Sequence, residues 1–219
     1  MTAGRSGLTE VGKVEGMIGM GGRLGARVLR APGAPLGWRL RTRLRPAYVW
    51  GWLCNLLAVL FTRLTGIPTL TSELRARLIC AGGQVLDFGV VDRRLVTQNG
   101  VGFIIDDWDD DTTDLTTMNY HASGTGTTAA SNTDTALETE ATSVTDRATG
   151  NKTQPAYNQL QTVGTQSFTG SAAITEHGLL SSATEGAGVL WDRHTFAAIN
   201  VGSGDSIQWT YTATINAET

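Results

Sequence analysis

Three histidines have the residue type best suited to catalysis or metal binding: His121, His177 and His194. Imidazole nitrogens bind zinc and transfer protons near neutral pH, so a zinc site gathered from all three is one interpretation. The three lie far apart along the chain and lack the short spacing typical of metal ligands. We therefore expect polar roles in strands or turns, and predict no catalytic residue, no metal site and no cofactor.

Two local motifs give no stronger sign of an enzyme. Glu176 precedes His177, but adjacent residues on a strand point to opposite faces and do not meet at one reacting centre. The run Gly-Thr-Gly-Thr-Thr at 124–128 lacks the following Lys-Ser/Thr and the strand–helix frame of a phosphate-binding loop, so it predicts a turn. We predict that the protein is not an enzyme.

Carboxylates are concentrated between Asp106 and Asp114. Their spacing departs from the 12-residue calcium loop, which needs Gly at the sixth position and Glu at the twelfth. We prefer a solvated acidic linker and leave a cation site open. Farther along, Arg193 follows Asp192 and is one of three basic residues after position 98. An ion pair or a subunit contact is expected to hold it.

Charge is distributed unevenly along the chain. Residues 1–98 carry 14 Lys and Arg against 5 Asp and Glu, whereas residues 99–219 carry 3 against 15. Residues 1–45, rich in glycine and arginine, are expected to form a basic extended arm that is ordered by a partner surface. Arginines could also contact the phosphates of a nucleic acid, and the neighbouring tryptophans could stack on its bases. The arm contains no known nucleic-acid-binding motif and the whole chain is acidic, so we expect no nucleic-acid partner.

One long apolar segment is predicted to be a helix over 47–64. Large side chains recur at helical spacing, and a second stripe is small and more polar. The large stripe is Trp50, Leu53, Leu57, Leu60 and Leu64, and the small stripe is Gly51, Asn55, Ala58 and Thr62. The apolar run is shorter than a membrane span and we expect no membrane partner. The helix should bury against protein, with Trp50, Leu53, Leu57, Phe61, Arg39, Arg41, Arg43 and Arg45 as the anchor.

Alternating patterns predict strands in the rest of the chain. A hairpin is expected over 74–97 with its turn at Ala81-Gly82-Gly83, followed by a short helix after Asn99. The clearest period of two lies in Ser206 to Ile215. We predict a mainly β chain in three parts: the arm 1–45, a helix and hairpin anchoring region 46–114, and an antiparallel, jelly-roll-like β-sandwich 115–219.

The C-terminal half resembles tailed-phage structural proteins, including head-decoration and tail or collar fibre modules. The resemblance rests on a set of motifs rather than on any one of them, covers roughly residues 115–216 and extends to the hairpin, but not to the basic arm. The motifs are Tyr120 to Ala129, Thr133 to Leu137, Ile174 to Leu179, Leu190 to Arg193 with Phe196, and Gly204 to Ile207. It implies an oligomeric virion component without catalytic residues.

The functional prediction combines this resemblance with the charge split and the apolar helix. We expect a capsid decoration, or cement, protein that binds the major capsid protein or another virion protein, forms a homotrimer and resides in the virion after assembly in the host cytoplasm. The alternatives are a tail, neck or baseplate and fibre-attachment protein, or a carbohydrate-binding module with Trp191, Tyr157 or Trp209 as stacking platforms.

Overall fold

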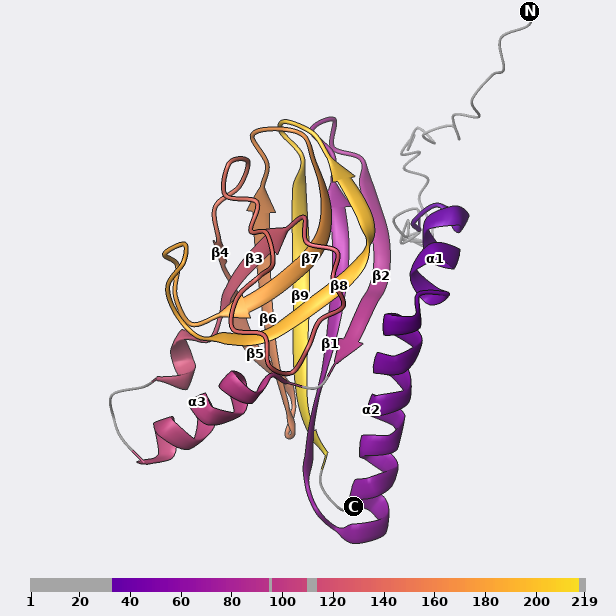
Figure 1. The fold of residues 1–219 in the computed structure, drawn as a ribbon. Coiled ribbons are helices and arrows are strands. Elements are labelled where there is room, and N and C mark those ends of the chain that lie inside the picture. Colours follow the sequence, from indigo (N-terminus) through magenta and orange to yellow (C-terminus); the bar gives the residue numbers. More distant parts are fainter. Residues whose placement is uncertain (1–32, 95, 110–113, 217–219) are drawn as a thin grey trace, which may run out of the picture. The chain divides into compact units, whose positions relative to one another are not determined.

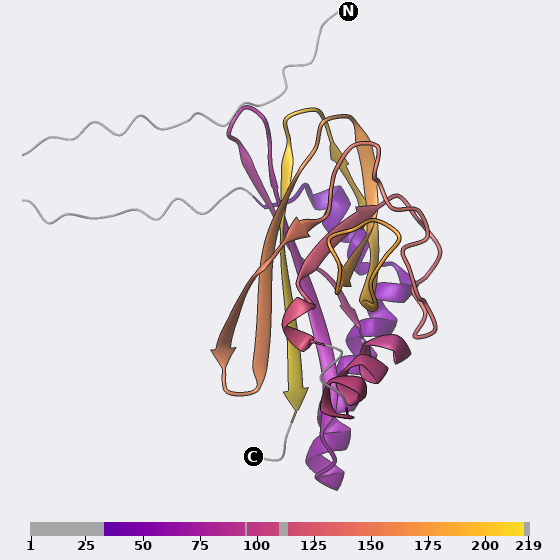
Figure 2. The ribbon, with the colours of Figure 1, turned by 90° about the vertical axis from the view of Figure 1, so that its left-hand side faces the viewer.

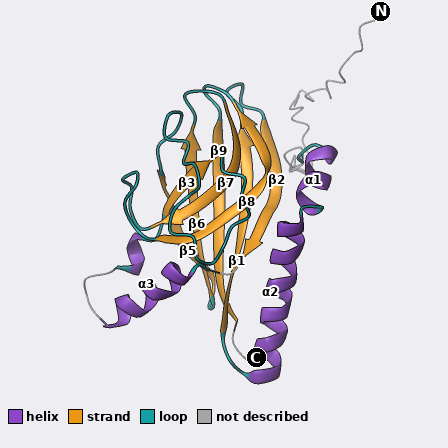
Figure 3. Cartoon of the chain, viewed as in Figure 1, coloured by secondary structure: helices purple, strands orange, loops and turns teal. Residues whose placement is uncertain are grey.

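The predicted mainly β architecture is confirmed. The computed structural model describes residues 33–94, 96–109 and 114–216, and strands account for 43% of the structure against 23% for helices. The strands form two antiparallel sheets that face each other as a sandwich (Figures 1 and 3). The finer expectation of a jelly roll stays a prediction.

The first sheet has five strands in the order β2-β1-β9-β6-β5 and the second has four in the order β4-β3-β7-β8. The five-stranded sheet consists of β1 (Thr69–Ile79), β2 (Val85–Arg94), β5 (Asn151–Ala156), β6 (Gln159–Ser167) and β9 (Ser206–Asn216). The four-stranded sheet consists of β3 (Tyr120–Gly124), β4 (Ala148–Thr149), β7 (Ala172–Leu180) and β8 (Leu190–Val201). The helices are α1 (Leu36–Arg43), α2 (Pro46–Thr65), α3 (Gln98–Asp109) and the 3-10 turn η1 (Leu115–Thr117).

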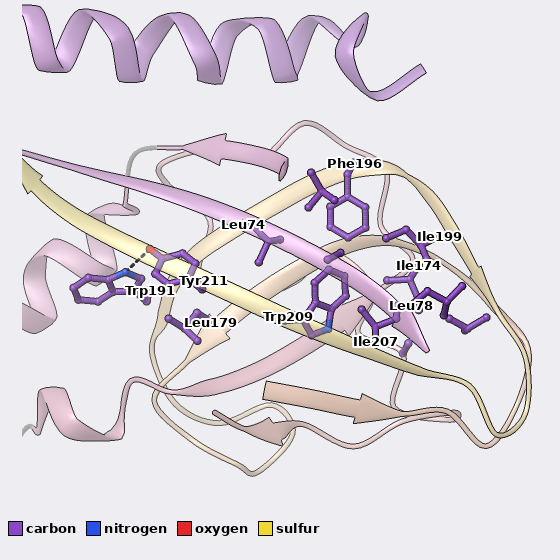
Figure 4. Close-up of a cluster of buried hydrophobic side chains, with 14 of the residues drawn as sticks. Leu74, Leu78, Ile174, Leu179, Trp191, Phe196, Ile199, Ile207, Trp209 and Tyr211 are labelled. Atoms are coloured by element: carbon purple, nitrogen blue, oxygen red, sulfur yellow. Dashed lines mark hydrogen bonds between the residues drawn. The ribbon is translucent and has the colours of Figure 1, made fainter. Parts of the chain in front are cut away.

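Strand β9 occupies the centre of the five-stranded sheet and supplies much of the core. Its alternation places Ile207, Trp209 and Tyr211 between the sheets, where all three are buried (Figure 4). The facing sheet contributes buried apolar side chains such as Ile174 and Phe196. Aromatic side chains of this size dominate the hydrophobic stabilisation of a small core.

The hairpin of β1 and β2 is part of the sandwich. Its turn forms at the expected place, where Gly83 adopts a positive φ of 81° and donates to the carbonyl of Cys80. Strand β1 then pairs with β9 along its whole length, from Thr69 opposite Asn216 to Ile79 opposite Ser206. The described residues from 33 onward accordingly belong to one compact unit, and the hairpin expected in the anchoring region 46–114 lies in the same sheet as β9.

One local expectation is corrected, and two further segments complete the sandwich. The segment 143–155 contains β4 and most of β5, because its polar residues pair with β3 and β6 at the sheet edges. The segment 135–142 is irregular. The arm expected to be extended as far as residue 45 contains α1, whereas its first 32 residues lie outside the described part of the chain.

Candidate docking surface

Helix α2 begins and ends at clear signals. Pro46 occupies its first turn, where the missing N–H carries no penalty, and Gly66 closes it in a left-handed conformation with φ of 71°. Together with α1 it lies beside β2, the edge strand of the five-stranded sheet, while α1 also contacts β8 (Figures 1 and 2). The helix pair therefore covers one side of the sandwich.

The small stripe of α2 faces the sandwich. Asn55 donates from Nδ2 to the carbonyl of Ser72 at 3.1 Å, and the hydroxyls of Thr62 and Thr69 hydrogen bond at 2.8 Å. Gly51 lies so close to β2 that a Cβ there would overlap the carbonyl oxygen of Arg93. These short-range contacts hold α2 to its own domain through its small stripe.

The large stripe of α2 faces away from the sandwich. Trp50 is 61% exposed, Leu57 50%, and Leu64 76%. Their neighbours on the same side are also exposed, namely Val49, Trp52, Leu56, Leu60 and Phe61. An amphipathic helix normally directs its apolar stripe toward the core of its own domain. Here the orientation is reversed, and the result is a contiguous apolar surface of a size that marks an interaction site.

Helix α1 extends this surface and adds positive charge. Trp38 anchors it, donating from Nε1 to the carbonyls of Ala197 and Ala198 at 3.1 and 3.0 Å and packing edge-on against Phe88. Its other apolar and basic side chains are exposed, namely Leu36, Leu40, Arg39, Arg41 and Arg43, and so is Leu44, which follows the helix. Residues 33–72 include five arginines and no Asp or Glu.

The structure places seven of the eight anchor residues expected from the sequence on exposed or partly exposed positions of α1 and α2. Those seven are Trp50, Leu53, Leu57 and Phe61 on α2 and Arg39, Arg41 and Arg43 on α1. Arg45 is the residue that precedes α2 and is partly buried. The sequence pattern identified the large stripe correctly, and the structure adds that the stripe is not covered by the described part of the chain.

The exposed helix also bears on the membrane question. Within the described residues, Tyr48–Thr65 is the one helix whose length and composition would allow it to cross a membrane, with a mean hydropathy of 1.2 and 11% of it buried. The small stripe of this helix is occupied by contacts with β1 and β2. The expectation that no membrane is bound stays a prediction.

Substituting Gly51 tests how α2 is held. The Gly51→Ala variant is expected to displace α2 from β2, because the new methyl group meets backbone rather than a movable side chain, at a cost of roughly 1–3 kcal/mol. Faster proteolysis within α2 would report the displacement. The control is Gly37→Ala in α1, where a Cβ meets nothing within 4 Å and the helix should become more stable. Equal proteolysis of the two variants would contradict this account of α2.

Arg193, expected in an ion pair or a subunit contact, is enclosed within its own chain. Its guanidinium reaches Glu176 at 2.8 Å, Asp134 at 2.9 Å and Glu138 at 3.3 Å. The Glu176 carboxylate also accepts from the backbone N–H groups of Gly126, Glu138 and Thr139. Only 3% of the Arg193 side chain is exposed, so its charge is balanced within its own chain. The expected ion pair is present, and the subunit contact stays a prediction. The pair fastens the segment 124–139 onto β7 and β8.

The three histidines, expected to be independent, meet between the sheets. His121 Nδ1 and His177 Nε2 are 2.9 Å apart, and the rings of His177 and His194 are 6.2 Å apart. His194 lies between two buried carboxylates, 3.4 Å from Asp92 and 3.3 Å from Asp192, although neither contact is aligned as a hydrogen bond. Among the described residues no group of three or more His, Cys, Asp or Glu is arranged to hold a metal ion.

Burial and charge push the histidine pKa values in opposite directions. Burial lowers the pKa of His121 to about 3. Burial, followed by the neighbouring His121 and His194, lowers the pKa of His177 well below its usual value. Burial alone would lower the pKa of His194, but the negative charges of Asp192 and Asp92 outweigh it and raise that pKa to about 9. The cluster therefore holds one charged and two neutral imidazoles at neutral pH.

The sequence reasoning missed this cluster because its members come from different strands. The register of β3, β7 and β8 brings them together: His177 lies opposite His194, and Ser123 lies opposite His177. Glu176 and His177 do point to opposite sides, as predicted, since Glu176 binds Arg193 while His177 stacks near Trp209. The available signal was the alternation within each strand, but pairing register is set by the whole sandwich.

The other candidate residues occupy separate places. Asp107 accepts the backbone N–H of Leu115, and Asp114 caps η1, so part of the acidic stretch has local structural roles. Asp110 and Asp111 lie outside the described residues, and a cation site there stays open. Comparisons of the chain with models of known protein families, with curated proteins and with solved structures found no match.

Proposed function

We propose that the protein is a non-enzymatic structural component of a tailed-phage virion that docks onto a larger protein assembly through α1 and α2. The supporting observation is the reversed orientation of α2, whose small stripe binds its own domain while its large apolar stripe is left exposed. Contiguous exposed apolar surface of this kind is costly for a solitary soluble protein and marks an interaction site. The virion assignment rests on the resemblance of the C-terminal half to phage structural proteins.

Within this role we favour a capsid decoration protein that acts as a homotrimer and binds the major capsid protein. The sandwich would face solvent, and the arginines of α1 would contact acidic residues of the capsid lattice. The alternative is a tail, neck or baseplate and fibre-attachment protein. The number of copies per purified particle, measured by quantitative mass spectrometry, separates the two. A number that matches the capsid lattice favours decoration, a number that matches one tail ring favours the alternative, and absence from particles contradicts both.

Charge reversal on α1 tests the docking surface. The Arg41→Glu variant is expected to bind particles roughly tenfold more weakly than the wild type, because it replaces attraction to an acidic partner by repulsion. Arg77→Glu is the control, since Arg77 is also exposed but lies on β1. Binding would be measured by co-sedimentation of each purified variant with particles that lack the protein. Equal losses for the two variants would argue against α1 as the contact.

The carbohydrate-binding alternative is weakened by the structure. Trp191 is 6% exposed and Trp209 is fully buried, so neither ring can stack on a sugar. Tyr157 is 75% exposed and lies at the rim of a cleft of about 430 Å³ that opens between the sheets. Of the three stacking platforms expected from the sequence, Tyr157 is the one that is exposed. Glycan-array binding by the full chain, lost in Tyr157→Ala, would support the carbohydrate-binding alternative.

A further inference from the structure

We propose that the outward face of α2 binds α2 of a second copy of this chain, so that copies associate through their helices. This inference rests on the proposed function in that both use α2 as the docking element. It goes further in naming the occupant of the apolar stripe, and it leaves α1 free to contact the rest of the assembly.

The spacing of the large stripe is that of a helix–helix seam, and four of its five side chains are exposed while Leu53 is partly buried. Trp50, Leu53, Leu57, Leu60 and Leu64 are separated by alternating steps of three and four residues. A repeat of this kind lets side chains of one helix insert between those of another, as in coiled coils. The contacts of Gly51, Asn55 and Thr62 with β1 and β2 fix the helix so that the seam points away from the sandwich.

The exposed area is sufficient for a stable contact. Eight large apolar side chains of α2 are each 46–76% exposed. From the usual size of such side chains they leave on the order of 800 Å² open, which is about one side of a standard protein interface. A second copy would cover this area with an identical face, so self-association requires no other protein.

The seam itself is uncharged. The five seam positions carry no charge, so two copies can meet there without burying an unpaired ion. The five arginines of residues 33–72 lie outside these positions, so the seam offers no cation to an anionic headgroup. A lipid surface also places no requirement on the three-and-four spacing.

The first test is the mass of the full chain in solution, measured by sedimentation equilibrium. We expect the wild type to form oligomers, and Leu57→Glu to weaken the association at least about 100-fold because it places a charge at the centre of the seam. The control is Ile105→Glu, because Ile105 is 53% exposed against 50% for Leu57 but lies on α3, and this variant should associate like the wild type. A monomeric wild type, or a Leu57→Glu variant that associates normally, would overturn the proposal.

The second test is disulfide crosslinking at the middle of the seam. In a chain with Cys54→Ser and Cys80→Ser, the added Leu57→Cys should form a disulfide between copies under mild oxidation. Gly82→Cys in the same background is the control, because Gly82 is exposed at the hairpin turn, away from α2. Equal crosslinking of the two variants, or none at Leu57→Cys, contradicts the proposed contact.

The outcomes also separate this proposal from its alternatives. A monomer that still decorates particles through α1 and α2 overturns the self-association and leaves the proposed function standing. If the chain forms oligomers through α2 but is absent from particles, the self-association stands and the proposed function is wrong. If the wild type is monomeric but sediments with phosphatidylglycerol vesicles, and Leu57→Glu does not, a lipid surface is the occupant and the proposal is wrong.

Discussion

Replacing Arg193 by methionine is expected to lower the free energy of unfolding by about 3–5 kcal/mol, the usual effect of removing one partner from a buried ion pair. Glu176 is fully buried and would lose the guanidinium that balances its charge. Asp134 and Glu138 would lose the same partner, so the segment 124–139 should also become mobile. Urea denaturation measures the first effect and hydrogen exchange of the segment measures the second.

An exposed pair provides the matched control. Arg75 contacts Glu73 at 2.7 Å, but 56% of its side chain is exposed. Ion pairs of this kind contribute about 0–1 kcal/mol, so Arg75→Met should change stability little. Adding Glu176→Gln to Arg193→Met should recover part of the loss, because the uncompensated charge is then removed. The account of a buried charge pair is wrong if Arg193→Met lowers the free energy of unfolding as little as Arg75→Met does. It is also wrong if the double variant loses the full sum of the two single losses.

The stability of the sandwich is expected to be greatest near pH 6.5, where the acidic effect of His121 and His177 meets the alkaline effect of His194. His121 and His177 have a folded-state pKa below the unfolded value, so the unfolded chain binds protons more readily. Stability should therefore decrease as the pH falls below about 6.5, the unfolded pKa of histidine, by roughly 1.4 kcal/mol for each unit of pKa shift. Urea midpoints between pH 5 and 6.5 isolate this effect, because carboxylates with ordinary pKa values of about 4 remain ionised there.

The alkaline limit has the opposite sign. The folded-state pKa of His194 is about 9, above its unfolded value, so the charged imidazole contributes stability at and below neutral pH. That contribution should decrease progressively as the pH rises from about 6.5, the unfolded pKa, to about 9, the folded pKa. His194→Gln should remove the alkaline slope, although it also lowers stability at all pH values by leaving Asp92 and Asp192 without their cation. His121→Asn should reduce the acidic slope and leave the alkaline one unchanged.

A flat profile between pH 5 and 6.5 would contradict the buried neutral imidazoles. An alkaline slope that survives in His194→Gln would show that another group titrates there. Both results concern the histidine side chains, which are fully buried, whereas the large stripe of α2 is exposed and is tested separately by association.

The sequence by itself determined the elements that depend on local patterns. The alternation in 206–216 predicted the buried face of β9, and the Ala81-Gly82-Gly83 run predicted the hairpin turn. The stripe of large residues over Trp50 to Leu64 predicted α2, and most of these side chains are exposed. In each case the signal lies within a dozen residues, where helix and strand periods act directly.

Only the tertiary structure decided which residues of distant segments meet. The pairing of β1 with β9 joined the hairpin to the sandwich, and the register of β3, β7 and β8 gathered three histidines that are far apart in the sequence. It also decided that α2 turns its small stripe inward, because Asn55 and Thr62 find polar partners on β1. Strand register and helix orientation are set by long-range packing, which no local period encodes.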